Sequence, residues 1–335
     1  MRRRDFTTLM RRLASAGFRK DFVQPAILPD WWDDSCGDDP AALTEVEIRV
    51  ARFLGMPLSV VGDPSTDLAS PGYPDAQLRR VRDIDRDRLA PAIHSAIQIA
   101  AAVVRSMRDP GRKLTLPPEN GVDWRSQIVR PHPAVVLADV LDDLWLRGIP
   151  VVPLDVLPAP SFQGLACTVE GRPVVLLGHK HDEPGRVAFL VAHEAGHIAA
   201  GDCAADQPVV DADEMIADDT DLERRADRFA TRVLVGADTI PEVQVRSHKE
   251  LATKALQLER SIGADATTII LGWARRTADY ANATMAVKAL YRGSGARRQL
   301  RQCFDHHVDV DGATESDRAL LRCVYGDPDR DATAA

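Results

Sequence analysis

The sequence predicts an α+β fold that is mostly helical and contains one small sheet. Residues 186–201 form an apolar run around a few polar side chains, which indicates a buried helix that ends at Gly201. Residues 221–234 repeat apolar side chains at helical spacing, which predicts an amphipathic helix. Three short runs rich in β-forming residues precede the first of these helices, at 149–153, 162–169 and 173–178.

The N-terminal part of the chain is expected to be helical. Helical patterns cover residues 5–17, 44–54 and 76–107, and Pro91 should start or kink the second half of the last one. Loops rich in proline, glycine and polar residues are expected at 22–40 and 62–74.

The chain is predicted to comprise three parts, because residues 109–133 are rich in proline and glycine pairs and mark a boundary. These parts are a helical N-terminal region with a regulatory or partner-binding role (1–115), a central domain (116–291) and a helical C-terminal tail with a disordered end (292–335). In the central domain, a helix precedes the strands, a hairpin turn joins two of them, and further helices follow residue 236. The ranges expected for these elements are 133–146, 170–172, 251–262, 266–277 and 284–291.

The charge distribution limits the partners of the protein. A net charge of −8 argues against a protein that coats nucleic acid along its whole surface. Residues 1–20, however, carry seven basic side chains against one acid, whereas residues 201–228 carry ten acids against three arginines. The basic arm at 1–20 is a candidate contact for nucleic acid or an acidic partner, and a solvated helix face is the alternative.

Targeting features and cysteines indicate a cytoplasmic protein. The sequence has no run of eighteen apolar residues, so we expect no membrane span, and the basic N-terminus lacks the apolar stretch of a secretory signal. The five cysteines are odd in number and scattered, which argues against a disulfide framework.

Residues 193–197 read His-Glu-Ala-Gly-His inside the buried helix. Residues four apart lie on one helical face, so His193 and His197 can present two imidazoles to one metal ion. Glu194 lies one position further round and can act as a base on a water molecule held by that ion. This pattern is typical of a catalytic zinc site and predicts one Zn²⁺ per chain. A satisfied polar patch on a helix is the alternative interpretation.

The third metal ligand is expected on the amphipathic helix. Glu223 would complete a His-His-Glu site, and Asp227 would accept a hydrogen bond from a ligand histidine and fix its tautomer. Two alternatives remain open. Residues 220–223 have the form of a capping box, in which Glu223 would only bond the helix N-terminus. Glu214 is a rival ligand.

Other residues are candidates for roles near the metal. Cys203 would silence the site by occupying the open metal position, unless it is a structural or exposed thiol. His179 or His181 would donate a hydrogen bond to the oxyanion, unless both are ordinary loop histidines. An extended substrate would add to an edge strand of the sheet. The candidate edge strand comprises Pro173, Val174, Val175, Leu176 and Leu177.

Two segments, 186–197 and 223–230, resemble the two signatures of the ImmA/IrrE family of HExxH metallopeptidases. The resemblance covers residues 130–290 approximately and implies a zincin-like metallopeptidase domain. It implies that His193, His197 and Glu223 bind zinc and that Glu194 is the base. The chain departs from the family at 235–236, where Val-Gly replaces the common Met-Pro pair, and residues 1–115 match no domain of the family.

Members of this family typically cleave a helix-turn-helix repressor encoded beside them, which derepresses phage, mobile-element, stress or defence genes. The resemblance therefore implies a zinc-dependent endopeptidase with such a repressor as its partner and substrate. A second hypothesis is a regulatory module that binds DNA, a toxin or a repressor and whose zinc site is structural or vestigial. A third, minor hypothesis is a metallohydrolase that acts on a non-peptide substrate.

Overall fold

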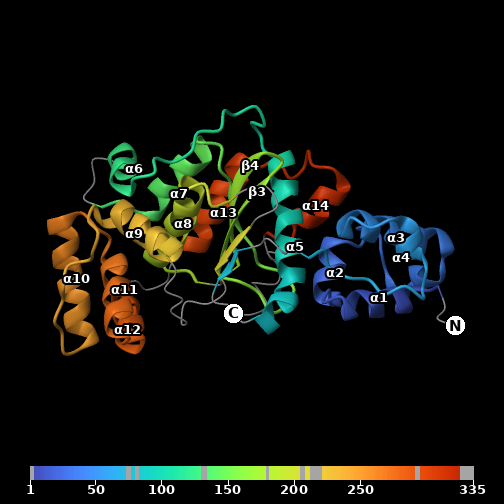
Figure 1. The fold of residues 1–335 in the computed structure, drawn as a ribbon, viewed down its shortest axis with the longest axis horizontal. Coiled ribbons are helices and arrows are strands. Elements are labelled where there is room, and N and C mark those ends of the chain that lie inside the picture. The colour runs from blue at the N-terminus through green and yellow to red at the C-terminus, as the bar shows by residue number, and fades with distance from the viewer. Residues whose placement is uncertain are drawn as a thin grey trace.

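A small mixed sheet lies at the centre of the protein, with helices on both of its faces. The computed structural model confirms the predicted α+β class, mostly helical, and describes residues 4–72, 77–79, 83–129, 134–178, 181–203, 208–211, 221–290 and 295–324. Figure 1 shows an elongated arrangement in which the first helices lie at one end and the helices between residues 248 and 290 lie at the other.

The N-terminal end is a group of short helices held by side-chain caps. The side chain of Asp5 accepts a hydrogen bond from the backbone N–H of Thr8 at the start of the first helix, and Asp39 caps the third helix in the same way. The third helix ends at Gly55, which has the left-handed backbone conformation that glycine tolerates best. The helices are α1 (Phe6–Ser15), α2 (Lys20–Ala26), α3 (Pro40–Leu54) and α4 (Leu58–Gly62).

The sheet has the strand order β1-β5-β3-β4-β2 and contains parallel and antiparallel pairs. Strands β3 and β4 form the predicted hairpin and pair along six residues each, with Gly164 opposite Leu177. Strand β2 pairs parallel to β4, β5 pairs antiparallel to β3, and β1 pairs parallel to β5. The strands are β1 (Gln77–Arg79), β2 (Val151–Pro153), β3 (Gly164–Val169), β4 (Arg172–Leu177) and β5 (Val209–Asp211).

The two faces of the sheet belong to two hydrophobic clusters, because successive side chains of a strand point to opposite faces. Leu165 and Cys167 of β3 pack with α5 (Asp83–Arg105) and the N-terminal helices, whereas Ala166 packs with α8 (Pro184–Ala199) on the other face. Figure 1 shows α5 and α8 on the two sides of the sheet. The N-terminal helices therefore share a hydrophobic core with one face of the sheet. The domain limits at 115/116 and 291/292 remain a prediction.

Helix α8, which contains His193 and His197, is surrounded by helices from several parts of the chain. It packs against α7 (Leu137–Leu146), α9 (Asp221–Val235) and α11 (Ala266–Thr277). Helices α10 (His248–Ile262) and α12 (Tyr280–Leu290) complete the end of the molecule with α11.

The last two described helices do not form a separate tail. Helix α13 (Ala296–His307) packs against α7 and β2, and α14 (Glu315–Leu321) packs against α5 and α2. The disordered end expected in the tail falls in residues 325–335, outside the described part of the chain. No described helix has both the length and the apolar character needed to cross a bilayer.

Several elements differ from the prediction. Helix α2 occupies part of the loop expected at 22–40, and strand β5 lies where no strand was predicted. Residues 77–79 form strand β1 rather than the first turns of a helix, because they pair with β5 far along the chain. Helix α6 (Gly121–Ile128) lies in residues 109–133, the stretch rich in proline and glycine that we expected to be a boundary. Asn120 caps this helix, and the fully buried Trp124 stacks on Phe229, so tertiary packing stabilises a helix that its glycine and neighbouring prolines disfavour.

Candidate metal centre

Helix α8 presents the two histidines from a fully buried face. Pro184 lies in its first turn, where the missing N–H costs no hydrogen bond, and every residue from Val187 to Ala199 is buried. His193 and His197 lie one turn apart, and their ring centroids are 4.9 Å from each other.

Helix α9 brings the third ligand because Gly196 lets it approach α8 closely. A Cβ atom at Gly196 would lie 3.1 Å from the ring of Phe229 and 3.3 Å from Cα of Ala226, closer than most real contacts. With α9 in this position, the buried Glu223 lies against both imidazoles. The capping-box alternative involves Thr220, which lies outside the described residues.

The three donors have the separations that a tetrahedral metal ion requires. Nε2 of His193 lies 3.1 Å from Oε2 of Glu223, Nε2 of His197 lies 3.4 Å from Oε1, and the two Nε2 atoms are 3.2 Å apart. Ligands at zinc bond lengths of about 2.0–2.1 Å are roughly 3.3 Å from one another in tetrahedral geometry. The donor set and its spacing thus fit a zinc ion without rearrangement.

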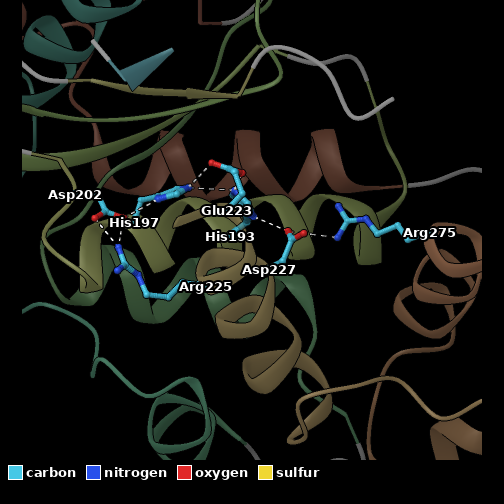
Figure 2. A network of polar contacts seen from close by, with 7 residues as sticks. All are labelled: His193, His197, Asp202, Glu223, Arg225, Asp227 and Arg275. Atoms are coloured by element: carbon cyan, nitrogen blue, oxygen red, sulfur yellow. Dashed lines mark hydrogen bonds and ion pairs between the residues drawn. The ribbon is translucent and has the colours of Figure 1, made fainter. Parts of the chain in front are cut away.

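A carboxylate orients the first histidine. Nδ1–H of His193 donates to Oδ1 of Asp227 at 2.9 Å, which directs the Nε2 lone pair toward the metal position. Arg275 of α11 lies 3.7 Å from the same oxygen and packs its guanidinium over the ring of Phe189. Figure 2 shows this chain from His193 through Asp227 to Arg275.

A second carboxylate, which we did not predict, orients the other histidine. Nδ1–H of His197 donates to Oδ2 of Asp202 at 3.0 Å, and Arg225 of α9 holds Asp202 through contacts of 2.6 and 2.8 Å (Figure 2). The helix end creates this contact. Gly201, at a φ of +74°, reverses the chain, and the N–H groups of Gly201 and Asp202 bond back to the carbonyls of Ile198 and His197.

The sequence does contain a signal for Asp202. When glycine ends a helix in this way, the next residue returns to the last turn of that helix. An acidic residue at this position, five after a candidate ligand histidine, is therefore a candidate partner of that histidine. Arg225, in contrast, reaches Asp202 only because α9 packs on α8.

Three ionisable side chains of the site have shifted pKa values in the metal-free chain. Burial lowers the pKa of His193, but hydrogen bonds with Asp227 and Glu223 outweigh burial and raise that pKa to about 10. Burial also opposes protonation of His197, whose pKa is nevertheless raised by hydrogen bonds with Asp202 and Glu223. Burial raises the pKa of Glu223, yet the two imidazoles hold it well below its usual range. A metal ion would therefore bind here in competition with protons.

Glu194 is fully buried and lies against the start of strand β3. A Cβ atom at Gly164 would collide with Oε1 of Glu194 and would lie 2.9 Å from its carboxyl carbon. A side chain at position 164 would therefore force the carboxylate of Glu194 to shift. The sequence prediction did not single out Gly164, because the contact joins residues thirty positions apart.

The remaining candidates divide into three groups. His181 lines the same pocket as His193. Cys203 packs against the hydrophobic cluster around α8 and does not join the group of described donor atoms that lie within 4.8 Å of one another. His179 and the rival ligand Glu214 lie outside the described residues.

The prediction that Pro173, Val174, Val175, Leu176 and Leu177 form an exposed edge is wrong. Strand β4, which contains them, lies between β3 and β2, and both neighbours hydrogen-bond to it. Strand β5 belongs to the acidic segment between α8 and α9. It pairs with the free side of β3 beside Glu194, with Asp211 opposite Gly164. The acidic segment thus contributes a strand next to the metal centre.

Some basic side chains of residues 1–20 make contacts within the protein. Arg12 is buried and donates to the backbone carbonyls of Val60, Val61 and Thr66, and Arg4 pairs with Glu47. The contact of residues 1–20 with nucleic acid remains a prediction. It now concerns only the exposed basic side chains of this segment.

Comparison with known proteins gives no family assignment, since no family model matches the chain and a search of curated proteins finds no match.

Proposed function

We propose that this chain is a zinc-dependent endopeptidase with a zincin-like domain, as its resemblance to the ImmA/IrrE family implies. One observation carries the proposal. Two imidazoles and Glu223 converge at zinc-like separations, and Asp227 and Asp202 each orient one of the imidazoles. A buried glutamate, Glu194, lies beside this set. A purely structural site needs no such base, which favours catalysis over the regulatory alternative.

The residues of the chain have separate roles in peptide hydrolysis. Zinc, when bound, would supply a Lewis acid that activates water and polarises the scissile carbonyl. Glu194 accepts the proton from the attacking water and returns it to the leaving amine. Asp227 and Asp202 keep the Nδ1 protons in place, so that both Nε2 atoms remain available as ligands.

We propose a specific protein substrate, and the resemblance points to a helix-turn-helix repressor. The scissile segment has to be exposed or locally unfolded, because the backbone groups of a folded helix are already paired. A DNA-binding protein offers basic residues, which complement the acidic residues between 201 and 228. The expected outcome of cleavage is derepression of phage, stress or defence genes.

The experiment combines metal analysis with cleavage assays. Purified protein is analysed for zinc and then incubated with a repressor encoded beside it and with unrelated unfolded proteins, with and without chelator. We expect one zinc per chain and one chelator-sensitive cut in the repressor. Glu194→Gln should keep the zinc and lose about a hundred- to ten-thousandfold in rate, because the amide cannot accept a proton.

Glu250→Gln is the matched control, since Glu250 is a glutamate of α10 that pairs with Lys254 away from the site. It should cleave at the wild-type rate. Wild-type cleavage by Glu194→Gln removes this residue from the mechanism. Protein that holds zinc but cuts no partner, in contrast, supports the regulatory alternative.

A further inference from the structure

The outer side of strand β3 is covered near both of its ends by the segment that follows α8. At one end, Oγ1 of Thr168 donates to the backbone carbonyl of Cys203 at 2.7 Å. At the other end, β5 pairs antiparallel with residues 164–166. Since β4 pairs with the other side of β3, this strand has a partner on each side.

The stretch that β5 covers is the part of the sheet beside the proposed base. The backbone of Gly164 passes so close to Glu194 that a Cβ atom there would lie 2.9 Å from its carboxyl carbon. In the strand ladder, the partner of Gly164 is Asp211 of β5. The backbone of β5 therefore follows the edge of β3 at the point where β3 passes the base.

Strand β5 is held in this position from two directions. Val209 and Val210 are both buried, and Val210 belongs to the same hydrophobic cluster as Leu165, its partner in β3. On its other side, β5 pairs parallel with β1, which precedes α5 in the chain. The position of β5 thus depends on buried side chains and on two neighbouring strands.

A substrate peptide would need the same edge. An extended peptide binds a sheet by adding to a strand whose backbone groups are free. A scissile segment that reaches both the metal centre and Glu194 would lie on the outer side of β3, because β3 is the strand that passes the base. The backbone groups on that side are already paired with β5, so a substrate has to compete with β5 for them.

We propose that β5 is an inhibitory strand, which occupies the substrate edge of β3 and has to leave it before a peptide is cleaved. The inference rests on the proposed peptidase activity, which supplies the peptide. A substrate then binds only those molecules in which β5 is displaced, and its apparent affinity is reduced by that fraction. The strand thereby protects exposed segments of unrelated proteins from cleavage.

Two metal-binding probes separate the strand edge from the metal. Acetohydroxamate binds a metal without any peptide backbone, whereas a hydroxamate joined through a succinyl group to trialanine amide also needs a strand edge. Both are titrated by calorimetry into the zinc-loaded full chain, and hydrogen exchange is followed by mass spectrometry in each complex. We expect the peptide probe, and not acetohydroxamate, to increase exchange at residues 209–211.

Proline in β5 should release the edge. Successive N–H groups of a strand point to opposite sides, so Val209→Pro combined with Val210→Pro removes one donor on the β3 side and one on the β1 side. The double variant should bind the peptide probe at least about tenfold more tightly than the unchanged protein, because the edge is open in more molecules. Its affinity for acetohydroxamate should not change.

A milder variant covers the case in which the proline pair does not fold. Val210→Ala keeps the backbone and removes part of a buried side chain, so it should strengthen binding of the peptide probe by at least about threefold. Val152→Ala is the matched control. Val152 is a fully buried valine of the same hydrophobic cluster in the three-residue strand β2, at the opposite edge of the sheet. This control should leave both affinities unchanged.

The outcomes distinguish the inhibitory strand from the peptidase activity. An unchanged affinity for the peptide probe in both β5 variants, or an equal gain in Val152→Ala, would overturn the inference while leaving the peptidase proposal intact. Binding of the peptide probe without increased exchange at residues 209–211 would overturn it as well. Failure of acetohydroxamate to bind the zinc-loaded protein would instead count against the peptidase proposal, and against the inhibitory role with it.

Discussion

Nδ1 of His197 lies 3.0 Å from a carboxylate oxygen of Asp202, the residue that follows the glycine at the end of the metal-site helix. The backbone N–H of Asp202 also bonds to the carbonyl of His197. One turn of chain therefore both ends the helix and orients a metal ligand. Asp227 gives the corresponding support to His193 from a different helix.

We expect Asp202→Ala to weaken zinc binding by about 10- to 100-fold without eliminating it, because the imidazole loses the acceptor that fixes its tautomer. Asp227→Ala should cause a similar loss at the other histidine, and Glu223→Ala a larger one because a ligand is removed. Competition with a chromophoric chelator measures all three. Asp221→Asn, an exposed change on α9, is the control. If Asp202→Ala binds zinc with wild-type affinity, the only role of Asp202 is to help end the helix.

Zinc affinity should increase with pH. Hydrogen bonds with the nearby carboxylates outweigh burial and raise the pKa of His193 to about 10 in the metal-free chain, so this ring is protonated near neutral pH and zinc has to displace the proton. Since protons are released on binding, the apparent Kd should fall by about tenfold per pH unit for each proton released. Titrations between about pH 6 and about pH 8 measure the slope. A flat dependence would mean that the histidines are already neutral before the metal arrives.

Gly164→Ala should reduce cleavage more than it reduces zinc binding. The new Cβ atom would collide with the carboxylate of Glu194 and displace the proposed base, and a shift of about 1 Å can cost about a hundredfold in rate. Zinc content and kcat are measured on the same preparation. Gly111→Ala is the control, because nothing lies within 4 Å of a Cβ atom there. An unchanged kcat in Gly164→Ala would show that the carboxylate has room to move.

The basic residues of the arm should fall into two groups. Buried ones stabilise the fold, and exposed ones are accessible to a partner. Arg12→Ala should lower the free energy of unfolding by about 3 kcal/mol, because three backbone carbonyls lose a charged donor in a buried setting. Arg11, Arg19 and Lys20 are exposed, so their joint replacement by glutamine should change stability by less than about 1 kcal/mol. If the arm contacts nucleic acid, the triple variant should lose salt-dependent binding of duplex DNA in anisotropy titrations. DNA binding equal to that of the unchanged protein would exclude these three residues as the contact.

The features of the site that the sequence alone predicted are those with a local cause. The helical repeat puts His193 and His197 on one face whatever surrounds the helix, and the same spacing puts Glu223 and Asp227 on one face of α9. The hairpin at residues 164–177 and the mostly helical character of the chain also follow from short-range patterns.

Only the tertiary structure decided which distant groups meet. Strand pairing between β3 and β5 put the chain's own acidic segment beside Glu194, and pairing of β2 with β4 left β4 inside the sheet. The close crossing at Gly196 brought Glu223 to the histidines, and packing of α11 and α12 built the pocket next to them. Side-chain periodicity specifies the direction of each residue on its own helix or strand. The choice of neighbouring element depends on the fit of buried surfaces far apart in the chain, which no local pattern contains.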